Sequence, residues 1–214
     1  DLDHGTPYIA MRYVAGETLA RRLAVAHETS TRPPDKAALR KSALLFEKIA
    51  RALHVAHEAG IVHRDVKPAN LMVTPEGEPV ILDFGLARED DGTLQGLSQS
   101  GEVSGTPAYM SPEQMTGRSR ADRRTDVWSL GIALYEAATL VHPFAAATRE
   151  GLFQSILSQE LPDPRRANPE IDRDLATILE TATAKERDRR YQSALDLAED
   201  LRRWRANEPI RARP

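Results

Sequence analysis

The strongest constraint on the fold of this 214-residue chain is a change of hydrophobic pattern at Gly60. From Ala37 to Ala59 the apolar residues recur at helical spacing, which predicts a long helix that ends at this glycine. Two short segments rich in β-branched residues, "NLMVT" and "PVILDF", then flank "PEGE", which has the composition of a turn. The sequence therefore predicts a long helix, a polar stretch "HRDVKPAN" and a small hairpin, in that order.

Most of the remaining sequence is expected to be helical. The segment "TPYIAMRYV" (6–14) predicts a strand, and "GETLARRLAVA" after it predicts a helix that starts near Glu17. Residues 85–112 show little periodicity, and a loop of that length in a compact domain is usually functional or disordered. Helical patterns follow at 113–117, 126–140, 148–158, 172–183 and 193–206.

Composition excludes several classes of protein. Apolar residues make up 41% and charged residues 29%, as in soluble domains, and the net charge of −3 favours neither nucleic acid nor a membrane surface as partner. The chain has no cysteine, which excludes disulfides and thiolate metal sites and fits a reducing cytoplasm. The run "VWSLGIALYEAATLV" is too short for a membrane segment and carries Glu136, and the basic end "LRRWRANEPIRARP" is interpreted as a solvated helix end and linker.

The polar stretch contains the parts of a phosphate-handling site. Asp65 could accept a proton, and Lys67, two residues on, would extend from the same side of an extended loop. Asn70 adds an amide oxygen, and Asp83 ends the second strand of the hairpin. A carboxylate base, a lysine and a pair of oxygen ligands suit Mg²⁺ holding phosphates, as phosphoryl transfer requires.

Five motifs, in order, resemble those of eukaryotic-type (Hanks-type) protein kinases. "HRDVKPAN" and "DFG" are similar to the catalytic loop and the metal-binding motif. "GTPAYMSPE" (105–113) resembles the end of the activation segment, "DVWSLG" (126–131) the large buried helix, and "MRYVAGETL" (11–19) the hinge. The resemblance covers nearly the whole chain and, within the family, is to bacterial serine/threonine kinases.

This resemblance implies an α+β protein-kinase-like fold, with a mainly helical C-terminal lobe, a hinge strand and a short catalytic-loop hairpin. Residues 1–19 would form the hinge strand and the start of the lobe, and residues 207–214 a basic linker. The lobe itself would span 20–206, with the catalytic loop at 63–70 and the activation segment at 83–113.

Catalytic roles are also implied by the resemblance. Asp65 would orient the substrate hydroxyl and accept its proton, while Lys67 would neutralise the transferred phosphate. Asn70 and Asp83 would hold two Mg²⁺ ions, and Thr106 would bridge toward Asp65 and Lys67.

ATP is the cofactor that the resemblance implies, and the hinge would bind its adenine. The backbone of Arg12 and Val14 would meet the base, with Met11 behind it and Glu17 near the ribose.

Other residues would support the site. His63 would pack against Phe84 of the "DFG" motif, which Gly85 completes, and Asp126 would hold the catalytic-loop backbone from behind. Arg64 would pair with a negative group on the activation segment. Glu113 would form an ion pair with Arg190, or with Arg189 if the match shifts by one residue. His54 and His57 are interpreted as packed or surface histidines rather than metal ligands, because no third ligand is evident.

Substrate and regulation follow from the same resemblance. Lys67 and the "GTPAY" segment favour serine and threonine of proteins as acceptors over tyrosine or small molecules. Ser98 and Ser100 are candidate phosphorylation sites, and Glu102 lies where many kinases carry an activating phosphothreonine. The kinase domain is expected in the cytoplasm, with room for a membrane anchor elsewhere in the full-length protein and for a dimer that autophosphorylates.

The sequence also departs from the family pattern. None of its twelve glycines is spaced two apart, so the chain has no Gly-rich phosphate loop. Its lysines, at 36, 41, 48, 67 and 185, include none in a "VAIK"-like strand before the hinge. We therefore expect the N-terminal lobe to precede residue 1 and the 214 residues alone to be inactive. The alternative function is a non-catalytic, kinase-like binding module.

Overall fold

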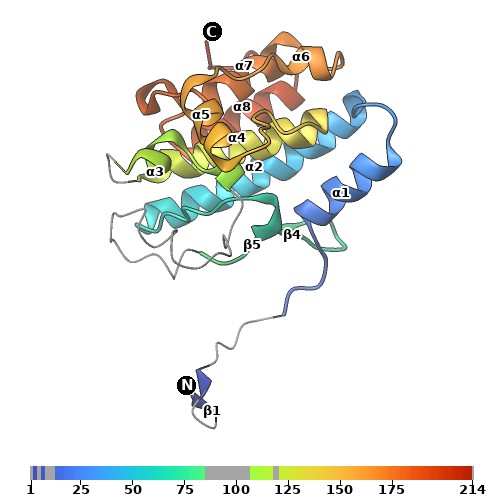
Figure 1. The fold of residues 1–214 in the computed structure, drawn as a ribbon. Helices are drawn as coiled ribbons and strands as arrows, with labels where there is room; N and C mark the ends of the chain where they lie inside the picture. The colour runs from blue at the N-terminus through green and yellow to red at the C-terminus, as the bar shows by residue number, and fades with distance from the viewer. Residues whose placement is uncertain (1, 4–5, 8–12, 85–106, 118–120, 214) are drawn as a thin grey trace.

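A computed structural model describes residues 2–3, 6–7, 13–84, 107–117 and 121–213, which are mostly helical with a small three-stranded sheet. The predicted α+β class, dominated by helices, is confirmed (Figure 1). None of the described helices combines the length and hydropathy that a bilayer span requires.

The long helix predicted before Gly60 is α2, Lys36–Glu58, and it organises the core. Its first turn is capped by Asp35, whose Oδ1 accepts a hydrogen bond from the Ala38 amide at 2.8 Å. Along its buried face Phe46, Ile49 and Leu53 are fully inaccessible to solvent. That face packs against α8 (Ala194–Arg205) and α4 (Arg123–Thr139), so three helices far apart in the sequence share one core.

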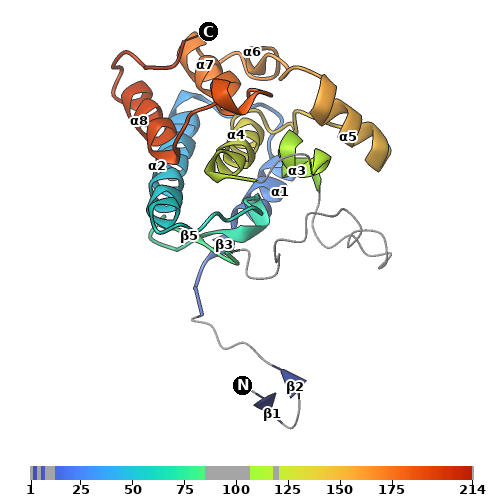
Figure 2. The same cartoon turned by 90° about the vertical axis from the view of Figure 1, so that its left-hand side faces the viewer.

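Helix α4 lies at the centre of the helical layer, between α2 on one side and α3 on the other (Figure 2). Nearly all of its side chains from Thr125 to Thr139 are buried, as expected for the apolar run around Trp128. The helix begins three residues earlier than predicted because the Asp122 side chain caps it, accepting from the Arg124 amide at 2.9 Å.

The other helices surround this centre, and the predicted helices after the long loop are all confirmed within a few residues. Besides α2, α4 and α8, the described helices are α1 (Leu19–Thr29), α3 (Pro112–Thr116), α5 (Arg149–Ser158), α6 (Pro164–Ala167) and α7 (Arg173–Ala182). Three described 3₁₀ turns join them: η1 (Pro68–Asn70), η3 (Pro107–Tyr109) and η4 (Arg187–Arg189). The short α6 and the 3₁₀ turns have too few residues to give a periodic signal, and the sequence did not predict them.

The predicted hairpin is confirmed as β4 (Leu71–Val73) and β5 (Pro79–Ile81), which pair antiparallel with Leu71 opposite Ile81. A third strand, β3 (Glu17–Thr18), pairs with β4 on its other side.

The start of α1 differs from the sequence prediction. The sequence predicts a helix start near Glu17, but this residue lies in β3 opposite Val73, and the helix begins at Leu19 with Thr18 as its cap. Gly16 explains the difference. Its φ is +142°, and a Cβ there would lie 2.3 Å from the Val73 carbonyl oxygen, so only glycine lets the chain approach β4 this closely.

The predicted strand 6–14 is only partly present. Its first residues form β2 (Thr6–Pro7), which pairs with β1 (Leu2–Asp3), and residues 8–12 lie outside the described part of the chain. Residues 13–15 are not in a strand, and Tyr13 is 86% exposed. The composition of this segment is typical of a strand, but 13–15 have no paired neighbour among the described residues.

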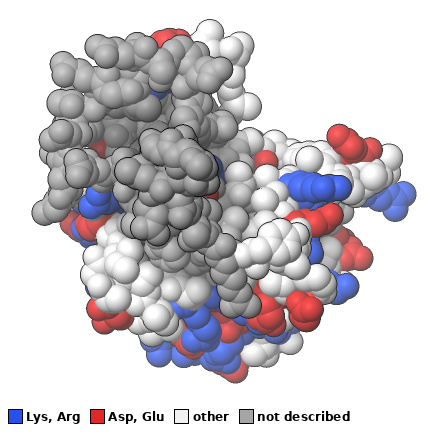
Figure 3. All heavy atoms as spheres, turned by 90° about the horizontal axis from the view of Figure 1, so that it is seen from below, with Lys and Arg blue, Asp and Glu red and all other residues white. Residues whose placement is uncertain are grey.

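The C-terminal segment, expected to be a basic linker, packs on the helices. Ile210 is buried in the main core, and the buried Asp200 accepts hydrogen bonds from the amides of Arg211 and Ala212, both at 2.8 Å. Basic composition indicated a solvated segment here, but one apolar side chain and one buried carboxylate hold it in place. On the face shown in Figure 3, acidic and basic side chains of the described residues are interspersed.

Candidate active site

The loop of residues 63–70 is anchored from behind by Asp126, in the first turn of α4. This fully buried carboxylate accepts hydrogen bonds from the amides of His63 (to Oδ2) and Arg64 (to Oδ1), both at 2.8 Å. Arg64 has a φ of +64°, a left-handed conformation that is uncommon for a residue with a side chain. The Asp126 carboxylate therefore holds a strained backbone in place just before Asp65.

His63 connects the loop to the end of the hairpin. Its Nδ1 accepts from the Asp65 amide at 3.2 Å, so Nε2 carries the proton and donates to the Leu82 carbonyl at 2.8 Å. Its ring lies 4.8 Å from that of Phe84, measured between centroids, at a tilt of 50°. The side chain is completely buried, and it links Asp65 to the segment that carries Asp83.

Two polar side chains contact Asp65. Lys67 donates from Nζ to Asp65 Oδ2 at 2.7 Å, and Asn70 donates from Nδ2 to the same oxygen at 3.0 Å. Asn70 Nδ2 also donates to the Asp65 carbonyl at 2.8 Å, which closes the loop on itself. The Asp65 side chain keeps 39% of its surface exposed, and its Oδ1 accepts no hydrogen bond from the described residues. One oxygen is thus fixed by two donors while the other can face a substrate.

Asn70 and Asp83 flank the two strands of the hairpin: Asn70 ends η1 just before β4, and Asp83, predicted to end the second strand, lies two residues after β5. The Leu82 amide donates to the Asn70 carbonyl at 2.9 Å, which extends the β4–β5 pairing and brings the next residue, Asp83, beside the Asn70 end of the loop. Asp83 is exposed and has a φ of +52°. Neither its carboxylate nor Asn70 Oδ1 accepts a hydrogen bond from any described residue.

These oxygens fit a hard cation. Carboxylate and amide oxygens are the ligands that Mg²⁺ takes, commonly as one or two protein groups together with substrate phosphates. No group of three or more His, Cys, Asp and Glu side chains suited to a metal occurs among the described residues. An ion held by Asn70 and Asp83 would therefore need further ligands from a bound molecule, as a metal–phosphate complex provides.

Of the residues expected to bind ATP at the hinge, Val14 and Glu17 are described. Val14 is half-buried, and the Glu17 carboxylate lies 3.7 Å from Arg21 Nε and 3.9 Å from Arg22 Nε on the exposed side of α1. Neither residue forms a hydrogen bond or ion pair with Asp65. Several predicted site residues lie outside the described part of the chain, namely Met11, Arg12, Gly85, Ser98, Ser100, Glu102 and Thr106.

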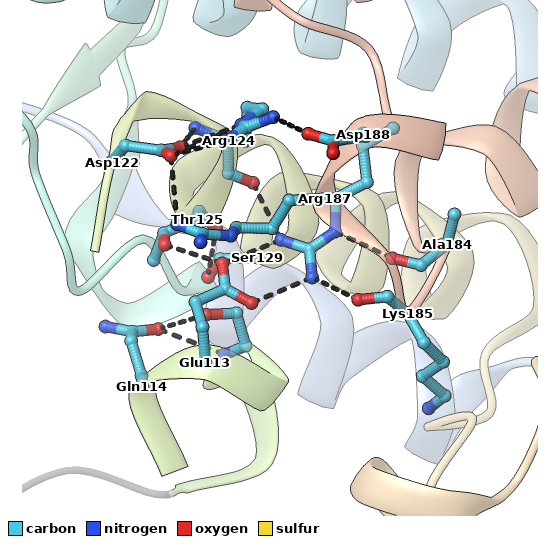
Figure 4. Close-up of polar contacts among 12 residues, drawn as sticks. Glu113, Gln114, Asp122, Arg124, Thr125, Ser129, Ala184, Lys185, Arg187 and Asp188 are labelled. Atoms are coloured by element: carbon cyan, nitrogen blue, oxygen red, sulfur yellow. Dashed lines mark hydrogen bonds and ion pairs between the residues drawn. The ribbon is translucent and has the colours of Figure 1, made fainter. Parts of the chain in front are cut away.

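Glu113 and Arg190 form a buried, two-pronged ion pair. Both Arg190 Nη atoms donate to the Glu113 carboxylate at 2.8 Å, and the side chains of Arg190 and Glu113 are 0% and 6% exposed. Figure 4 shows the surrounding contacts, with the Thr125 hydroxyl donating to Glu113 at 2.8 Å. The alternative partner, Arg189, is 76% exposed and lies 3.9 Å from Glu186.

The electrostatics of this pair favour the charged state. Burial alone would raise the pKa of Glu113, but the hydrogen bonds and positive charge of Arg190 outweigh it and hold the pKa below its usual value. Arg190 also donates from Nε to the Ala184 carbonyl at 2.7 Å and from Nη2 to the Lys185 carbonyl at 3.0 Å. The pair therefore ties α3 to the turn before α8.

Two supporting residues were not identified from the sequence. Gln114 donates from Nε2 to the Arg64 carbonyl at 2.7 Å and accepts from the Ser111 amide at 3.0 Å. Its place three residues after Ser111 is the pattern of a helix-capping box, which could have indicated a cap but not the loop contact. His57 lies in the last turn of α2, and its Nε2 is 2.7 Å from Asp126 Oδ2.

Comparison with known proteins identifies a family that matches most of the chain. The model of the protein kinase domain family matches residues 2–203. The chain is 35% identical over 206 residues to a probable serine/threonine-protein kinase of Streptomyces coelicolor, covering 96% of this chain and 29% of that protein. It is 36% identical over 210 residues to serine/threonine-protein kinase PknB of Mycobacterium tuberculosis, covering 96% and 32%. It is 37% identical over 205 residues to tyrosine-protein kinase MasK of Myxococcus xanthus, covering 92% and 31%.

The chain thus spans about a third of the length of these curated relatives, as the shares of 29%, 32% and 31% indicate. The family model, by contrast, takes in residues 2–203, which include the loop around Asp65, the hairpin and every helix from α1 to α7. The chain belongs to the protein kinase family.

Proposed function

We propose that this chain is the C-terminal lobe of a serine/threonine protein kinase, which transfers the γ-phosphate of ATP to hydroxyl groups of proteins. The observation that best supports this is the arrangement of the Asp65 carboxylate. Oδ2 accepts hydrogen bonds from Lys67 and Asn70 at 2.7 and 3.0 Å, and Oδ1 accepts none from the described residues. A carboxylate fixed in this way can orient a hydroxyl and accept its proton.

The proposed reaction breaks the bond between the γ-phosphorus and its bridging oxygen and forms one to the acceptor oxygen. Asp65 takes the proton that the acceptor hydroxyl loses, and the displaced ADP carries away the bonding electron pair. Lys67, 2.7 Å from Asp65, is close enough to offset negative charge on the transferred group. Mg²⁺, held by Asn70 and Asp83, would supply charge neutralisation at the phosphates. Thr106 would complete the contact between Asp65 and Lys67.

ATP and Mg²⁺ are the cofactors that protein kinases use, and binding of the adenine at the hinge extends the proposal. The backbone of Arg12 and Val14 would meet the base, with Met11 behind it and Glu17 near the ribose. The Gly-rich loop and the strand lysine, absent from these 214 residues, would come from an N-terminal lobe encoded before Asp1.

Serine and threonine are favoured as acceptors over tyrosine. Lys67, two residues after Asp65, is the feature that resembles serine/threonine kinases, although one of the similar proteins is named a tyrosine kinase. Acid hydrolysis of phosphorylated acceptor proteins, followed by separation of the phosphoamino acids, tests this directly. Phosphoserine and phosphothreonine are expected, and phosphotyrosine as the main product would overturn the assignment.

We also propose regulation by phosphorylation of the activation segment at Ser98 or Ser100, with Arg64 receiving the added charge. Mass spectrometry of the active enzyme should find phosphate on one of these serines. An active enzyme that carries an unmodified segment would refute this switch. The cytoplasmic placement of the domain, a membrane anchor elsewhere in the protein and dimerisation for autophosphorylation remain proposals by analogy with the family.

The test of the main proposal replaces Asp65 by Asn in the kinase domain extended at its amino terminus by the upstream coding sequence. This change removes the proton acceptor and keeps the shape of the side chain. Labelled ATP, Mg²⁺ and an acceptor protein should give transfer with the unmodified domain and a loss of at least about 100-fold with the variant. Asp174→Asn is the matched control, because this carboxylate is exposed on α7, outside the site. Transfer by the Asp65 variant at the level of the control would overturn the role of Asp65 as base, and no transfer by the unmodified domain would favour a non-catalytic binding module.

A further inference from the structure

A groove with a volume of about 940 Å³ lies between helices α1 and α2 and reaches the turn of the hairpin. Helix α1 packs on β3, β4 and η1, whereas α2 packs on α4 and α8, so the facing sides of α1 and α2 are not closed against each other. Among the described residues that line the groove, none belongs to the loop of residues 63–70. The groove is therefore separate from the site around Asp65.

The interior of the groove is largely apolar. Leu23 of α1 and Phe46 of α2 line it and are buried, and Leu45 is partly buried beside them. The apolar surface continues onto the rim, where Leu44 is 37% exposed. A small enclosed ligand would leave this rim in water, whereas a peptide laid along the groove covers the interior and the rim together. Apolar surface of this kind, bordered by polar residues, is typical of a site that binds another chain.

Charged side chains surround this apolar surface, and basic ones outnumber acidic ones. Those that line the groove are Arg22, Arg32, Lys41, Lys48, Asp35 and Glu76. Two of the cations have a carboxylate partner. Lys48 bonds to Glu78 of the hairpin, and Arg22 Nε lies 3.9 Å from a carboxylate oxygen of Glu17.

Arg32 and Lys41 carry the charge that is not balanced. Both are exposed, and neither forms a hydrogen bond or an ion pair with any residue in the described part of the chain. Asp35, between them in the sequence, caps α2, and its carboxylate accepts from the Ala38 amide at 2.8 Å. The start of α2 at Lys36 adds the partial positive charge of a helix amino terminus. This end of the groove therefore attracts carboxylates.

We propose that the groove binds a segment of the protein substrate in which leucine or similar apolar side chains lie beside acidic ones. The apolar side chains would cover Leu44 and Leu45, and the carboxylates would pair with Arg32 and Lys41. The identity of the partner as a substrate rests on the kinase function proposed above. Because the groove is separate from Asp65, the bound segment raises the effective concentration of the acceptor hydroxyl. It should lower the KM for the protein substrate and leave kcat nearly unchanged.

Peptide binding to the 214-residue chain tests the charge requirement without catalysis. The probe is a short labelled peptide in which leucines alternate with glutamates, and its match carries lysines in place of the glutamates. By fluorescence anisotropy the glutamate peptide should bind at least about tenfold more tightly, and added salt should reduce the difference. Lys41→Glu should weaken its binding at least about fivefold, while Lys36→Glu, exposed on the same helix and outside the groove, should change it little. The double variant Arg32→Glu, Lys41→Glu should prefer the lysine peptide.

A second pair of variants tests the apolar contact. Leu44→Asp places a charge on the rim and should weaken binding of the glutamate peptide at least about tenfold. Val55→Asp, further along the same helix, 71% exposed and outside the groove, is the matched control and should leave binding unchanged.

In the kinase domain extended at its amino terminus, appending the glutamate segment to an acceptor protein should lower its KM at least about fivefold, and Lys41→Glu should remove this gain. If the extended domain is inactive, the proposed function fails, but peptide binding still decides the role of the groove. Equal binding of the two peptides, or equal binding by Lys41→Glu and Lys36→Glu, would overturn the inference. So would dimerisation of the chain that Leu44→Asp abolishes, which would assign the groove to a second copy, or loss of peptide binding in the extended domain, which would assign it to the segment before Asp1.

Discussion

The pair of Glu113 and Arg190 gives the sharpest prediction for stability. Replacing Arg190 by Met removes the two guanidinium donors from a carboxylate that is 6% exposed and leaves a buried charge with only the Thr125 hydroxyl as a side-chain donor. Removing one partner of a buried ion pair typically costs about 3–5 kcal/mol. Arg190 also loses its contacts with the carbonyls of Ala184 and Lys185, so we expect the upper part of this range.

The cost is a large fraction of the stability of a domain, which is about 5–15 kcal/mol in total. For a chain of this length it corresponds to a fall of about 6–20 °C in Tm. Urea unfolding of the 214-residue chain, followed by circular dichroism, measures it. Arg189→Met is the matched control: Arg189 is 76% exposed and lies 3.9 Å from Glu186, so its replacement should cost less than about 0.5 kcal/mol.

The contribution of the Glu113–Arg190 pair to the stability of the fold depends on pH in a defined direction. Arg190 holds the pKa of Glu113 below its usual value, so the pair stabilises the fold above the unfolded pKa of about 4.3, and this contribution is lost as pH falls through the lowered value. Without Arg190, burial raises the pKa of Glu113, and the folded variant binds a proton that the unfolded chain does not. The destabilisation by Arg190→Met should therefore be smaller at pH 5 than at pH 7.

A second substitution tests the reasoning. Glu113→Leu in the Arg190→Met background removes the uncompensated charge, so the double variant should be more stable than Arg190→Met alone at pH 7. If Arg190→Met costs no more than Arg189→Met, or if the double variant is no more stable than the single one, a buried charge is not the source of the effect.

Three further predictions concern the backbone, a buried cation and the chain on its own. Gly16→Ala should lower the free energy of unfolding by more than Gly60→Ala in urea titrations, because a Cβ at Gly16 would lie 2.3 Å from the Val73 carbonyl oxygen while one at Gly60 meets nothing within 4 Å. Burial lowers the pKa of Lys185 to about 8, so the stability of the chain should rise between pH 8 and pH 10, where the unfolded lysine still binds its proton, and Lys185→Met should remove that rise. The 214 residues alone, incubated with labelled ATP and Mg²⁺, should transfer no more phosphate than an Asp83→Ala variant, because positioning of the phosphates supplies most of the catalysis of this reaction.

Elements with a local signal could be predicted from the sequence. The helix before Gly60, the hairpin from Leu71 to Ile81 and the helices after the long loop each contain enough residues to show their own period. The cluster of Asp65, Lys67 and Asn70 lies within six residues, so its members were bound to meet once the loop was closed.

Features that depend on contacts between residues far apart in the sequence could not be predicted from local patterns. The start of α1 is set by the close approach of Gly16, just before β3, to Val73 in β4, two segments that are far apart in the sequence. The choice of Arg190 over Arg189 depends on the η4 turn, which ends at Arg189 and directs only the next side chain toward Glu113. Sequence patterns locate the end of an element only to within a few residues, so they cannot distinguish Arg190 from Arg189.

For His57, the position along α2 carries more information than the residue type. A histidine near a helix end is usually a packed or surface residue, and two of them three apart carry little evidence for a metal. The periodicity of α2, however, places His57 four residues after Leu53, on the stripe that faces the core. A polar ring on a buried stripe needs a polar partner, and the acidic residue at the start of the apolar run of α4 is Asp126. An unpaired polar side chain costs too much free energy to stay buried, so a polar residue on a buried helical face predicts a polar partner elsewhere in the core. For His57 this rule would have indicated the contact with Asp126.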